Sequence, residues 1–165
     1  MATLYWAANG AMATTAALVK VTTGTSVKTM LQIASSATRP LKIVEWGISF
    51  DGSAAATPIE CELIQTDVAA TVTAHVAAGV QPYDDPNAPA STVTLGTAAT
   101  GYTASAEGSI TTTRTFDAQL VAPTNQYVKQ WPLGREAQLP ISKFLRVRVT
   151  AGAAVSAYTY VIWEE

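Results

Sequence analysis

The sequence predicts an all-β protein: an antiparallel β-sandwich of about eight strands that is jelly-roll-like and carries an N-terminal arm. Three observations lead to this fold class. Apolar and polar residues alternate with a period of two in several segments, which is typical of half-buried strands. Turn-forming residues recur about every 8–12 residues, as they do in sandwiches. No helical segment alternates with the strands, which excludes a βαβ arrangement.

The chain has 165 residues, a length at which one domain buries roughly 70% of its unfolded surface. We therefore expect a single sandwich domain over residues 18–165. Residues 1–17, rich in Ala and Thr, show no clean period and predict an extended arm. The aromatic pair Tyr5 and Trp6 indicates that this arm is held in place, either on its own domain or on a neighbouring subunit.

The first half of the domain contains the clearest strands. Residues 18–21 and 27–35 predict two strands, and residues 41–51 predict the best defined one. We expect Trp46 to fill the centre between two sheets. One face of its strand carries Val44, Trp46, Ile48 and Phe50, and the other carries Ile43, Glu45, Gly47, Ser49 and Asp51.

A further strand is predicted at residues 59–66. Because its glutamates alternate with apolar residues, one face is expected in the core and the other in solvent. Cys61 should then be a buried small hydrophobe. The inward residues are Ile59, Cys61 and Leu63, and the outward ones are Glu60 and Glu62.

The middle of the chain is less regular. Residues 67–79 are compatible with a short helix capped by Asp67, but their Val and Thr content favours strand or loop. Residues 79–108 predict a long loop excursion without a strong core pattern. Loops of that length inside a compact domain usually serve function or make contacts.

Two more strands follow the excursion. Residues 110–121 predict a strand with Phe116 and Leu120 on the core side, beside Ile110. Residues 127–133 alternate, and Pro132 makes them an edge strand or a bulge because proline cannot donate to a ladder. The residues on one side of this strand are Tyr127, Lys129, Trp131 and Leu133.

Residues 144–165 predict a C-terminal hairpin turning near Gly152. In the first strand Arg146 and Arg148 are expected on the solvent face. The second strand is apolar on both sides and should lie centrally, under a second cover. Glu164 and Glu165 are expected as a solvated end that discourages edge pairing. One face of the second strand carries Val155, Ala157, Thr159, Val161 and Trp163, and the other carries Tyr158, Tyr160 and Ile162.

The composition indicates an assembly component. Charged residues make up 13% of the chain, against about 25% in typical domains, so that much of the surface is suited to protein contacts. Net charge is −2 and the cations are scattered singly, which argues against nucleic-acid binding. No apolar run is long enough to span a membrane, no signal peptide is recognised, and one cysteine suits a reducing cytoplasm.

The sequence offers little chemistry, and we expect no enzyme activity, no cofactor and no metal. His75 is the only histidine, and no nucleophile motif surrounds it. Zinc needs three or four Cys or His ligands, and the acidic residues near Asp84 and Asp85 do not match a calcium loop. The catalytic alternative is a hydrolase that uses His75 with Asp84 or Asp85.

The C-terminal third resembles structural proteins of tailed bacteriophages. The segments QWPLGREAQLP and FLRVRVTAGAAVSAYTYVIWEE are similar to a phage pattern in which a PLG-(R/E)-E loop precedes an LRVRVTA-(P/G)-AAV hairpin and an aromatic strand closes with EE. RPLKIVEWGISFDG and IECELIQTD are also similar to these proteins. The resemblance covers residues 38–67 and 126–165 and departs from the pattern in the 79–108 excursion and the arm.

The resemblance implies a virion protein with a jelly-roll-like sandwich, namely a capsid decoration (cement) protein on the head exterior. Its implied partners are the major capsid protein and itself, as a homotrimer, after synthesis in the host cytoplasm. The alternative is a tail-associated or carbohydrate-binding host-attachment protein, with Trp131, Tyr83 or Tyr102 as sugar platforms. The residues expected at protein contacts are Leu4, Tyr5, Trp6, Tyr83, Tyr158, Tyr160 and Ile162.

Overall fold

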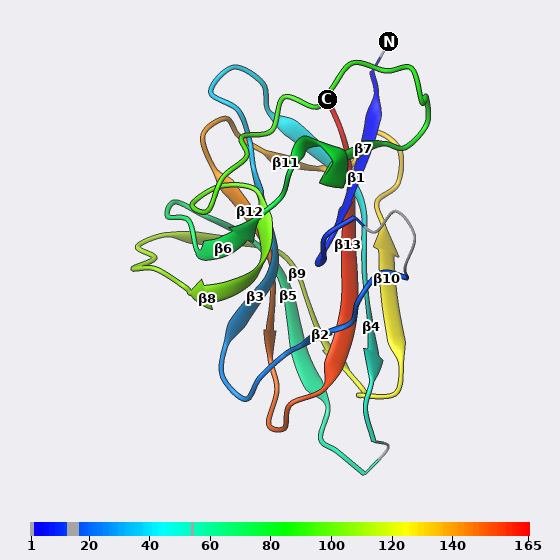
Figure 1. Cartoon of the computed structure of the whole chain (residues 1–165), viewed down its shortest axis with the longest axis vertical. Helices are drawn as coiled ribbons and strands as arrows, with labels where there is room; N and C mark the ends of the chain where they lie inside the picture. The colour runs from blue at the N-terminus through cyan, green and yellow to red at the C-terminus, as the bar shows by residue number, and fades with distance from the viewer. Residues whose placement is uncertain (1, 13–16, 54) are drawn as a thin grey trace.

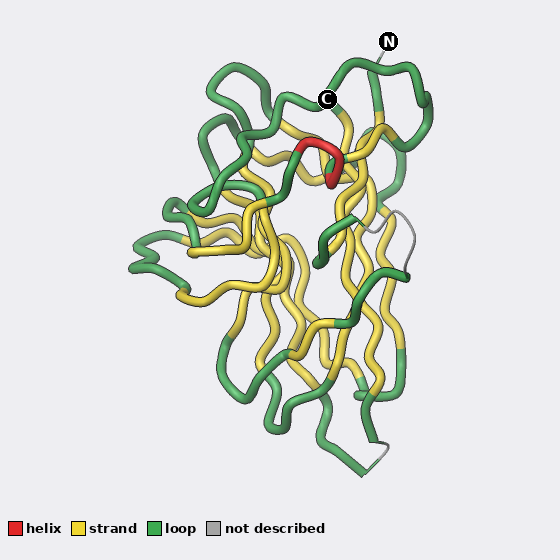
Figure 2. The backbone as a smooth tube through the Cα atoms, viewed as in Figure 1, coloured by secondary structure: helices red, strands yellow, loops and turns green. Residues whose placement is uncertain are grey.

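The chain folds into two antiparallel sheets stacked face to face, which confirms the predicted β-sandwich (Figures 1 and 2). The computed structural model describes residues 2–12, 17–53 and 55–165. Loops gather at the two ends of the sandwich, and β6 and β8 extend one sheet to the side (Figure 1). Strands β6 and β8 are Thr71–Ala74 and Gly101–Ala106.

Thirteen strands make up the two sheets, more than the eight expected, because short pairings were not foreseen. Sheet A has the order β10 (Gln126–Gln130), β4 (Leu41–Asp51), β13 (Ser156–Glu164), β1 (Leu4–Ala8) and β7 (Gln81–Pro82), with β11 (Ala137–Leu139) beside β4 and β2 (Val21–Thr22) beside β13. Sheet B has the order β6, β8, β3 (Lys28–Ala34), β12 (Phe144–Thr150), β5 (Ile59–Thr66) and β9 (Thr113–Val121). Among the described residues, one 3-10 turn, Ala77–Gly79, precedes β7. Within the part of the chain described, no helix has the length and apolar character needed to cross a membrane.

Strands β4 and β5 have the bounds that the sequence predicts. Near the beginning of β4, however, the predicted inner and outer sides are wrong. A bulge opposite Ile162 and Trp163 shifts its register. As a result Ile43, expected outside, is fully buried, and Val44, expected inside, is only half-buried. Trp46 is fully buried in the centre as predicted. Simple alternation fails here because a bulge adds one residue to one strand and reverses every side chain beyond it.

The prediction that β12 and β13 pair with each other as a C-terminal hairpin is wrong. Strand β12 pairs with β3 and β5 in sheet B, whereas β13 pairs with β4, β1 and β2 in sheet A. The connection around Gly152 therefore crosses from one sheet to the other. Each strand is paired along both of its edges in its own sheet, which satisfies its backbone more fully than one hairpin partner. The central position of β13 is confirmed.

The core lies between the sheets and is dominated by two tryptophans, Trp46 from β4 and Trp163 from β13. Strand β12 contributes every second residue, as its alternation predicts. The inward face of β5 is also confirmed, with Cys61 fully buried. The main inward residues of these strands are Ile59, Cys61, Leu63, Leu145, Val147, Val149, Ala157 and Val161.

Arg146 on β12 is not solvated as predicted, because its side chain is 0% exposed. Residues 67–70 and 107–112 carry the chain across the outer face of sheet B, from β5 and β9 to β6 and β8. The Asp67 carboxylate accepts hydrogen bonds from the backbone of Thr111 and Thr112, which joins the two crossing segments. These bonds and that of the Thr111 hydroxyl lower the pKa of Asp67 to about 2.

Buried polar side chains of sheet B hold this crossing in place. The Arg146 guanidinium donates to the carbonyl oxygens of Val68 and Glu107. Gln32 on β3 donates to the carbonyl of Ala99 at 2.6 Å and accepts from the amide of Ala70 at 2.8 Å. The crossing segments lack ladder partners at these points, so that the side chains supply the hydrogen bonds their buried backbone needs.

Strand β9 also reverses its expected facing. A bulge at Phe116 shifts its register against β5. Leu120, expected in the core, is 71% exposed, and Asp117 takes an inward position that is almost fully buried. Phe116 keeps partial contact with the core. A bulge and an inward-pointing charge are both devices that discourage pairing at a sheet edge, and β9 is the edge strand of sheet B.

The N-terminal arm is part of the sandwich over residues 4–8, which form β1 between β13 and β7. Tyr5 of its aromatic cluster packs on the same chain, against Trp163, and contact of the arm with a neighbouring subunit stays a prediction. Residues 13–16 of the predicted arm lie outside the described residues. Thr3 and Glu165 exchange two backbone hydrogen bonds, which places the two ends of the chain side by side (Figure 1).

The long excursion is pinned along its length rather than projecting freely. Tyr5 donates its hydroxyl hydrogen to the carbonyl of Pro89 at 2.8 Å. The Glu165 carboxylate accepts from Ser91, from Thr92 and from the Trp163 indole, so that this glutamate is an anchor and not the solvated end expected. The part of the excursion around residues 83–92 therefore forms a cap over one end of the sandwich. The prediction of a loop is wrong for residues 101–106, which form β8 in sheet B.

Candidate interaction surface

An aromatic surface covers the outer side of sheet A. In the β1–β13 ladder Trp6 lies opposite Ile162, and Ala8 lies opposite Tyr160. Directly opposed residues share a face of the sheet, so these side chains point away from the core. Tyr83, which follows β7, donates its backbone N–H to the carbonyl of Leu4 at 2.7 Å and adjoins the same surface. We define the aromatic face as Leu4, Trp6, Tyr83, Tyr158, Tyr160 and Ile162.

Tyr160 is fixed at the centre of this face by a close approach to glycine. A Cβ atom at Gly47 would lie 2.6 Å from the Tyr160 ring, so that only glycine lets the ring lie across β4. The Tyr160 hydroxyl donates to the Glu45 carboxylate at 2.5 Å. Burial and this carboxylate raise the pKa of Tyr160 well above its ordinary value. The phenol is therefore neutral at pH 7, and its ring is held on both sides, by Gly47 and by Glu45.

Tyr158 and Tyr83 frame the two ends of the face. The Tyr158 hydroxyl donates to the carbonyl of Leu18, so that the segment before β2 partly covers its ring. Tyr83 is 60% exposed, although its backbone is held on β1 and the neighbouring Asp84 accepts from the Leu4 amide at 3.1 Å. Such anchoring pre-organises an exposed aromatic side chain and lowers the entropic cost of binding.

The structure brings six of the seven predicted contact residues to this face, and their role in protein contacts stays a prediction. Tyr5 points the other way: it is 2% exposed and stacks on Trp163 with ring centroids 6.1 Å apart. Ile162 lies on the outer face but is only 5% exposed, because neighbouring side chains cover it. Tyr5 therefore belongs to the core, whereas Ile162 is an outer-face residue that its neighbours bury.

A shallow hollow of about 350 Å³ opens beside the aromatic face, between β1 and β7. Trp6, Gln81, Pro82 and Tyr83 line it. Apolar rings with one amide group are the composition of a small binding site that fixes a ligand by stacking and a few hydrogen bonds. The other two aromatic residues proposed as sugar platforms are less suitable, because Trp131 and Tyr102 are half-buried against the core.

His75 has a structural environment. Its side chain is buried, its Nε2 lies 2.8 Å from the carbonyl oxygen of Ala8, and its ring packs on Tyr102. Because a carbonyl oxygen only accepts, Nε2 carries the hydrogen. Burial lowers the pKa of His75, so that the ring is neutral at pH 7. The imidazole links the end of β1 to the loop after β6.

The other groups considered for chemistry are also engaged. Burial raises the pKa of the Cys61 thiol to about 12, which makes it unreactive. Asp84 accepts from the backbone of Leu4 and Asp85 from that of Asn87, and neither is hydrogen-bonded to His75. Across the described ranges, no three His, Cys, Asp or Glu side chains are grouped so that they could hold a metal ion.

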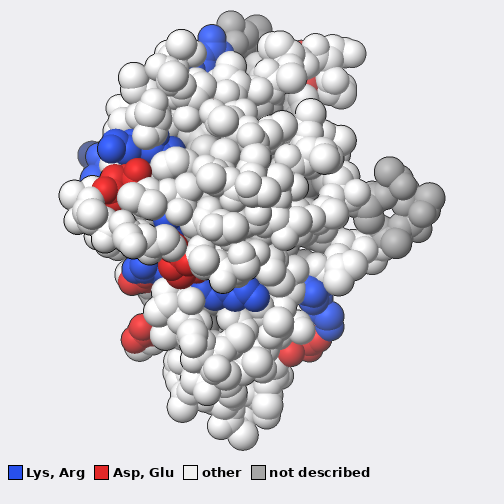
Figure 3. Space-filling model, turned by 60° about the vertical axis from the view of Figure 1, so that its left-hand side comes forward, with Lys and Arg blue, Asp and Glu red and all other residues white. Residues whose placement is uncertain are grey.

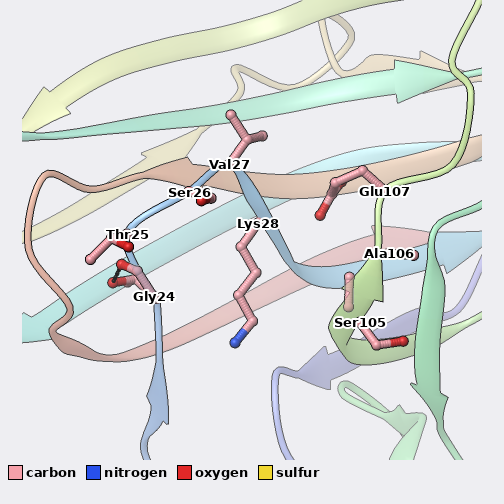
Figure 4. A pocket seen from close by; sticks show the side chains of 10 residues that line it. Gly24, Thr25, Ser26, Val27, Lys28, Ser105, Ala106 and Glu107 are labelled. Carbon is pink, nitrogen blue, oxygen red and sulfur yellow. Dashed lines mark hydrogen bonds between the residues drawn. The ribbon is translucent and has the colours of Figure 1, made fainter.

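A second hollow, of about 370 Å³, lies between residues 23–28 and 104–107 (Figure 4). Its two charged side chains, Lys28 and Glu107, come from facing segments. Lys28 donates to the carbonyl of Thr22, and Glu107 binds Arg146 together with the backbone and hydroxyl of Thr29. These groups serve the fold, and the rest of the lining is small and polar.

The charge distribution does not define a binding site for a charged ligand. On the face in Figure 3, acidic and basic side chains lie in a few mixed groups, and a larger area carries neither. Among the described residues, three ion pairs lie at or near the surface, and they join Lys20 to Asp51, Lys42 to Glu164 and Arg148 to Glu62. Pairs of this kind contribute little binding potential.

Comparison with protein-family models, with curated proteins and with solved structures finds no match to this chain. Function is therefore argued from the surface of the chain itself. Sequence reasoning missed one exposed residue of note, Leu133, which was placed at the end of a strand on the same side as Tyr127 and Trp131 and is 96% exposed. The Pro and Gly that flank it were the signal for a projecting turn.

Proposed function

We propose that this chain is a structural virion protein of a tailed bacteriophage, a capsid decoration protein that binds the head exterior and stabilises it. It does so by burying surface against the major capsid protein, and it self-associates as a homotrimer. The observation that carries the proposal is the aromatic face. Aromatic residues such as Trp6, Tyr83 and Tyr160 are enriched at the centres of protein interfaces, where burial contributes most to affinity.

Three further features support this function. The low charge of the chain suits a surface that is covered in an assembly. The rings of the face are fixed before binding, by Gly47 and by backbone hydrogen bonds to Leu4 and Leu18, so that little conformational entropy is lost on contact. The resemblance of residues 38–67 and 126–165 to phage structural proteins gives the partner, the major capsid protein.

Replacing Trp6 by alanine should weaken binding to heads by at least about tenfold, because truncating a central aromatic residue of an interface commonly costs 2 kcal/mol or more. The measurement is co-sedimentation with heads assembled from the major capsid protein of the same phage, with head melting as a second readout. Ile141→Ser, an exposed apolar residue between β11 and β12, is the matched control and should bind as the unmodified chain does. Equal binding by the Trp6 variant would remove the aromatic face from the proposal, and no binding by the unmodified chain would remove the function.

A second candidate function, carbohydrate binding for host attachment, is favoured by the hollow of Trp6, Gln81, Pro82 and Tyr83. Aromatic rings offer flat apolar platforms and the Gln81 amide offers a donor and an acceptor, which together suit a sugar. We expect Tyr83→Ala to abolish any glycan signal while leaving head binding within about threefold, since Tyr83 lies at the margin of the face. A glycan array tests this, and an unmodified chain without signal excludes the candidate.

A further inference from the structure

Leu133 stands at the tip of a rigid turn between β10 and β11. The Arg135 amide donates to the carbonyl of Pro132 at 2.9 Å, and Gly134 has a φ of +80°. A positive φ at the third position is what a tight turn of this kind requires, and glycine adopts it without strain. The Glu136 carboxylate accepts a hydrogen bond from the Gly134 amide at 2.9 Å, which further fixes the turn.

This turn holds a leucine side chain almost entirely in water. Leu133 is 96% exposed, more than any other large apolar residue among those described. Single exposed apolar residues are common on protein surfaces, but most of them are on mobile side chains or loops. Here four consecutive residues, 132–135, are fixed by hydrogen bonding, and a fixed apolar knob loses little entropy when it enters a socket.

The chain also carries a candidate socket, on the outer face of sheet B. A hollow of about 590 Å³ is lined by neighbouring residues of β5 and β9. Leu120 lies opposite Glu60 in this ladder, and the small Ala118 lies opposite Glu62, which leaves the depression between them. Leu120 is 71% exposed and supplies an apolar wall. The lining residues are Glu60, Cys61, Glu62, Ala118, Gln119 and Leu120.

Charge complementarity links the knob to this hollow. Arg135, two residues after Leu133, is exposed, and its guanidinium has no ion-pair partner within the described part of the chain. Glu60 at the rim of the hollow is likewise exposed, and the pairs found within the described ranges do not include it. Glu62 is already paired with Arg148 at 2.8 Å. The acidic rim thus offers one carboxylate to an incoming cation.

The knob and the hollow cannot meet within one chain. The turn of Leu133 lies beside the beginning of β4, because Ala137 in β11 pairs with Ile43. The hollow lies beside the beginning of β5, which follows the end of β4 in the chain. Since β4 runs the length of sheet A, the two features are at opposite ends of the sandwich, and on different sheets.

We propose that Leu133 of one copy inserts into the hollow between Glu60 and Leu120 of a second copy, with Arg135 paired to Glu60. The contact joins two different surfaces and is therefore heterologous. Contacts of this type close into rings when the rotation permits and otherwise extend into open chains. The proposal rests on the self-association included in the proposed function, but it leaves the aromatic face free for the capsid.

Molar mass in solution tests the contact, by light scattering or sedimentation velocity on the purified chain. The unmodified chain should be an oligomer, and Leu133→Ser should be a monomer. Arg135→Glu and Glu60→Arg should each weaken association by about tenfold or more, because a like-charge contact replaces an ion pair. The double variant Arg135→Glu with Glu60→Arg should recover the oligomer. All three side chains changed are exposed, so that loss of the fold does not explain a loss of mass.

A mixing experiment sharpens the result. Leu133→Ser keeps an intact hollow, and Glu60→Arg keeps an intact knob, so that an equimolar mixture of the two should form a species of twice the monomer mass and nothing larger. A monomeric unmodified chain, an oligomer that survives Leu133→Ser, or a double variant that stays dissociated would each overturn the contact. Co-sedimentation with heads separates the two proposals: binding by a monomeric Leu133→Ser chain keeps the capsid function and confines the variant's defect to self-association.

Discussion

Replacing Glu107 by alanine is expected to lower the free energy of unfolding by about 3–5 kcal/mol, the range for breaking a buried ion pair from one side. The Arg146 guanidinium lies 3.1 Å from the Glu107 carboxylate and is fully buried. Alanine would leave that positive charge under the crossing segments without its counter-charge. It would also remove the acceptor of the Thr29 amide and hydroxyl, both at 2.6 Å.

The cost is expected to come from the orphaned charge more than from the lost attraction. Burying a guanidinium is expensive, and its partner offsets that expense. Burial lowers the pKa of Arg146, whereas the negative charge of Glu107 raises it. The two effects on the charged guanidinium therefore oppose each other. Removing both charges, with Glu107→Ala and Arg146→Met together, should therefore restore at least about 1 kcal/mol relative to Glu107→Ala alone.

Urea denaturation followed by tryptophan fluorescence measures these differences. Glu62→Ala is the control, because its pair with Arg148 is on the same sheet and partly solvated; it should cost at most about 1 kcal/mol. Hydrogen exchange should show the loss of protection concentrated at residues 67–70 and 107–112. A Glu107→Ala variant as stable as the Glu62 control would show that Arg146 is satisfied by the carbonyls of Val68 and Glu107 alone.

Arg146 also shows where sequence reasoning reaches its limit. Its alternation with Leu145 and Val147 places it correctly on the outer side of β12, and the strand itself is confirmed. Whether that outer side is exposed to solvent depends on which segments, distant in the sequence, cross it. Residues 67–70 and 107–112 are far from Arg146 in the sequence, and their small polar residues carry no periodic signal. A local pattern determines the facing of a side chain, but not what covers it.

The side of the sheet on which each side chain lies could be predicted only where the ladders are regular. The bounds and inner faces of β5 and β13 follow from a period of two. Ile43 and Leu120 were misplaced because bulges in β4 and β9 add a residue, and a bulge is set by the partner strand, which one sequence does not reveal. Pairing failed for the same reason: β12 and β13 are adjacent in the chain but join different sheets.

The aromatic face was predictable in its centre and not at its margins. The two-sided apolar character of residues 155–163 indicated a covered or contact-making outer side, and Tyr158 and Tyr160 are found there, half-buried. The register that adds Trp6 to this face and turns Tyr5 into the core depends on which ladder position each residue takes. Those positions differ by one residue, which reverses a side chain's direction.

The second large effect is expected at Asp117, where alanine should lower the free energy of unfolding by about 3 kcal/mol. This carboxylate points inward from β9 and joins the two sheets at their open edge. The indole of Trp46 donates to it at 3.2 Å, the hydroxyl of Tyr127 at 2.9 Å and the ammonium group of Lys129 at 3.1 Å. Alanine would orphan all three donors. The cost is placed at the lower end of the range for a broken buried pair because Lys129 is 34% exposed.

Asp117 should also couple stability to acid. Burial alone would raise its pKa, but the hydrogen bonds of Lys129, Tyr127 and Gln119 outweigh burial and hold the pKa below its ordinary value of 3.8. A carboxylate whose pKa is lower in the folded state stabilises the fold above its unfolded pKa, and this contribution is lost as the pH falls through the folded value. The loss should therefore begin below about pH 4.

Urea midpoints measured from neutral pH down to about pH 2.5 test both statements. Asp117→Asn keeps an acceptor for Trp46 and Tyr127 but cannot titrate, so that it should lose less stability than alanine at neutral pH and show a shallower fall below about pH 4. Asp51→Ala, which removes an exposed pair with Lys20, is the matched control and should change the midpoint little. Asp117 would be an ordinary edge residue if its alanine variant matched that control, because donors that are truly buried cannot lose their acceptor without cost.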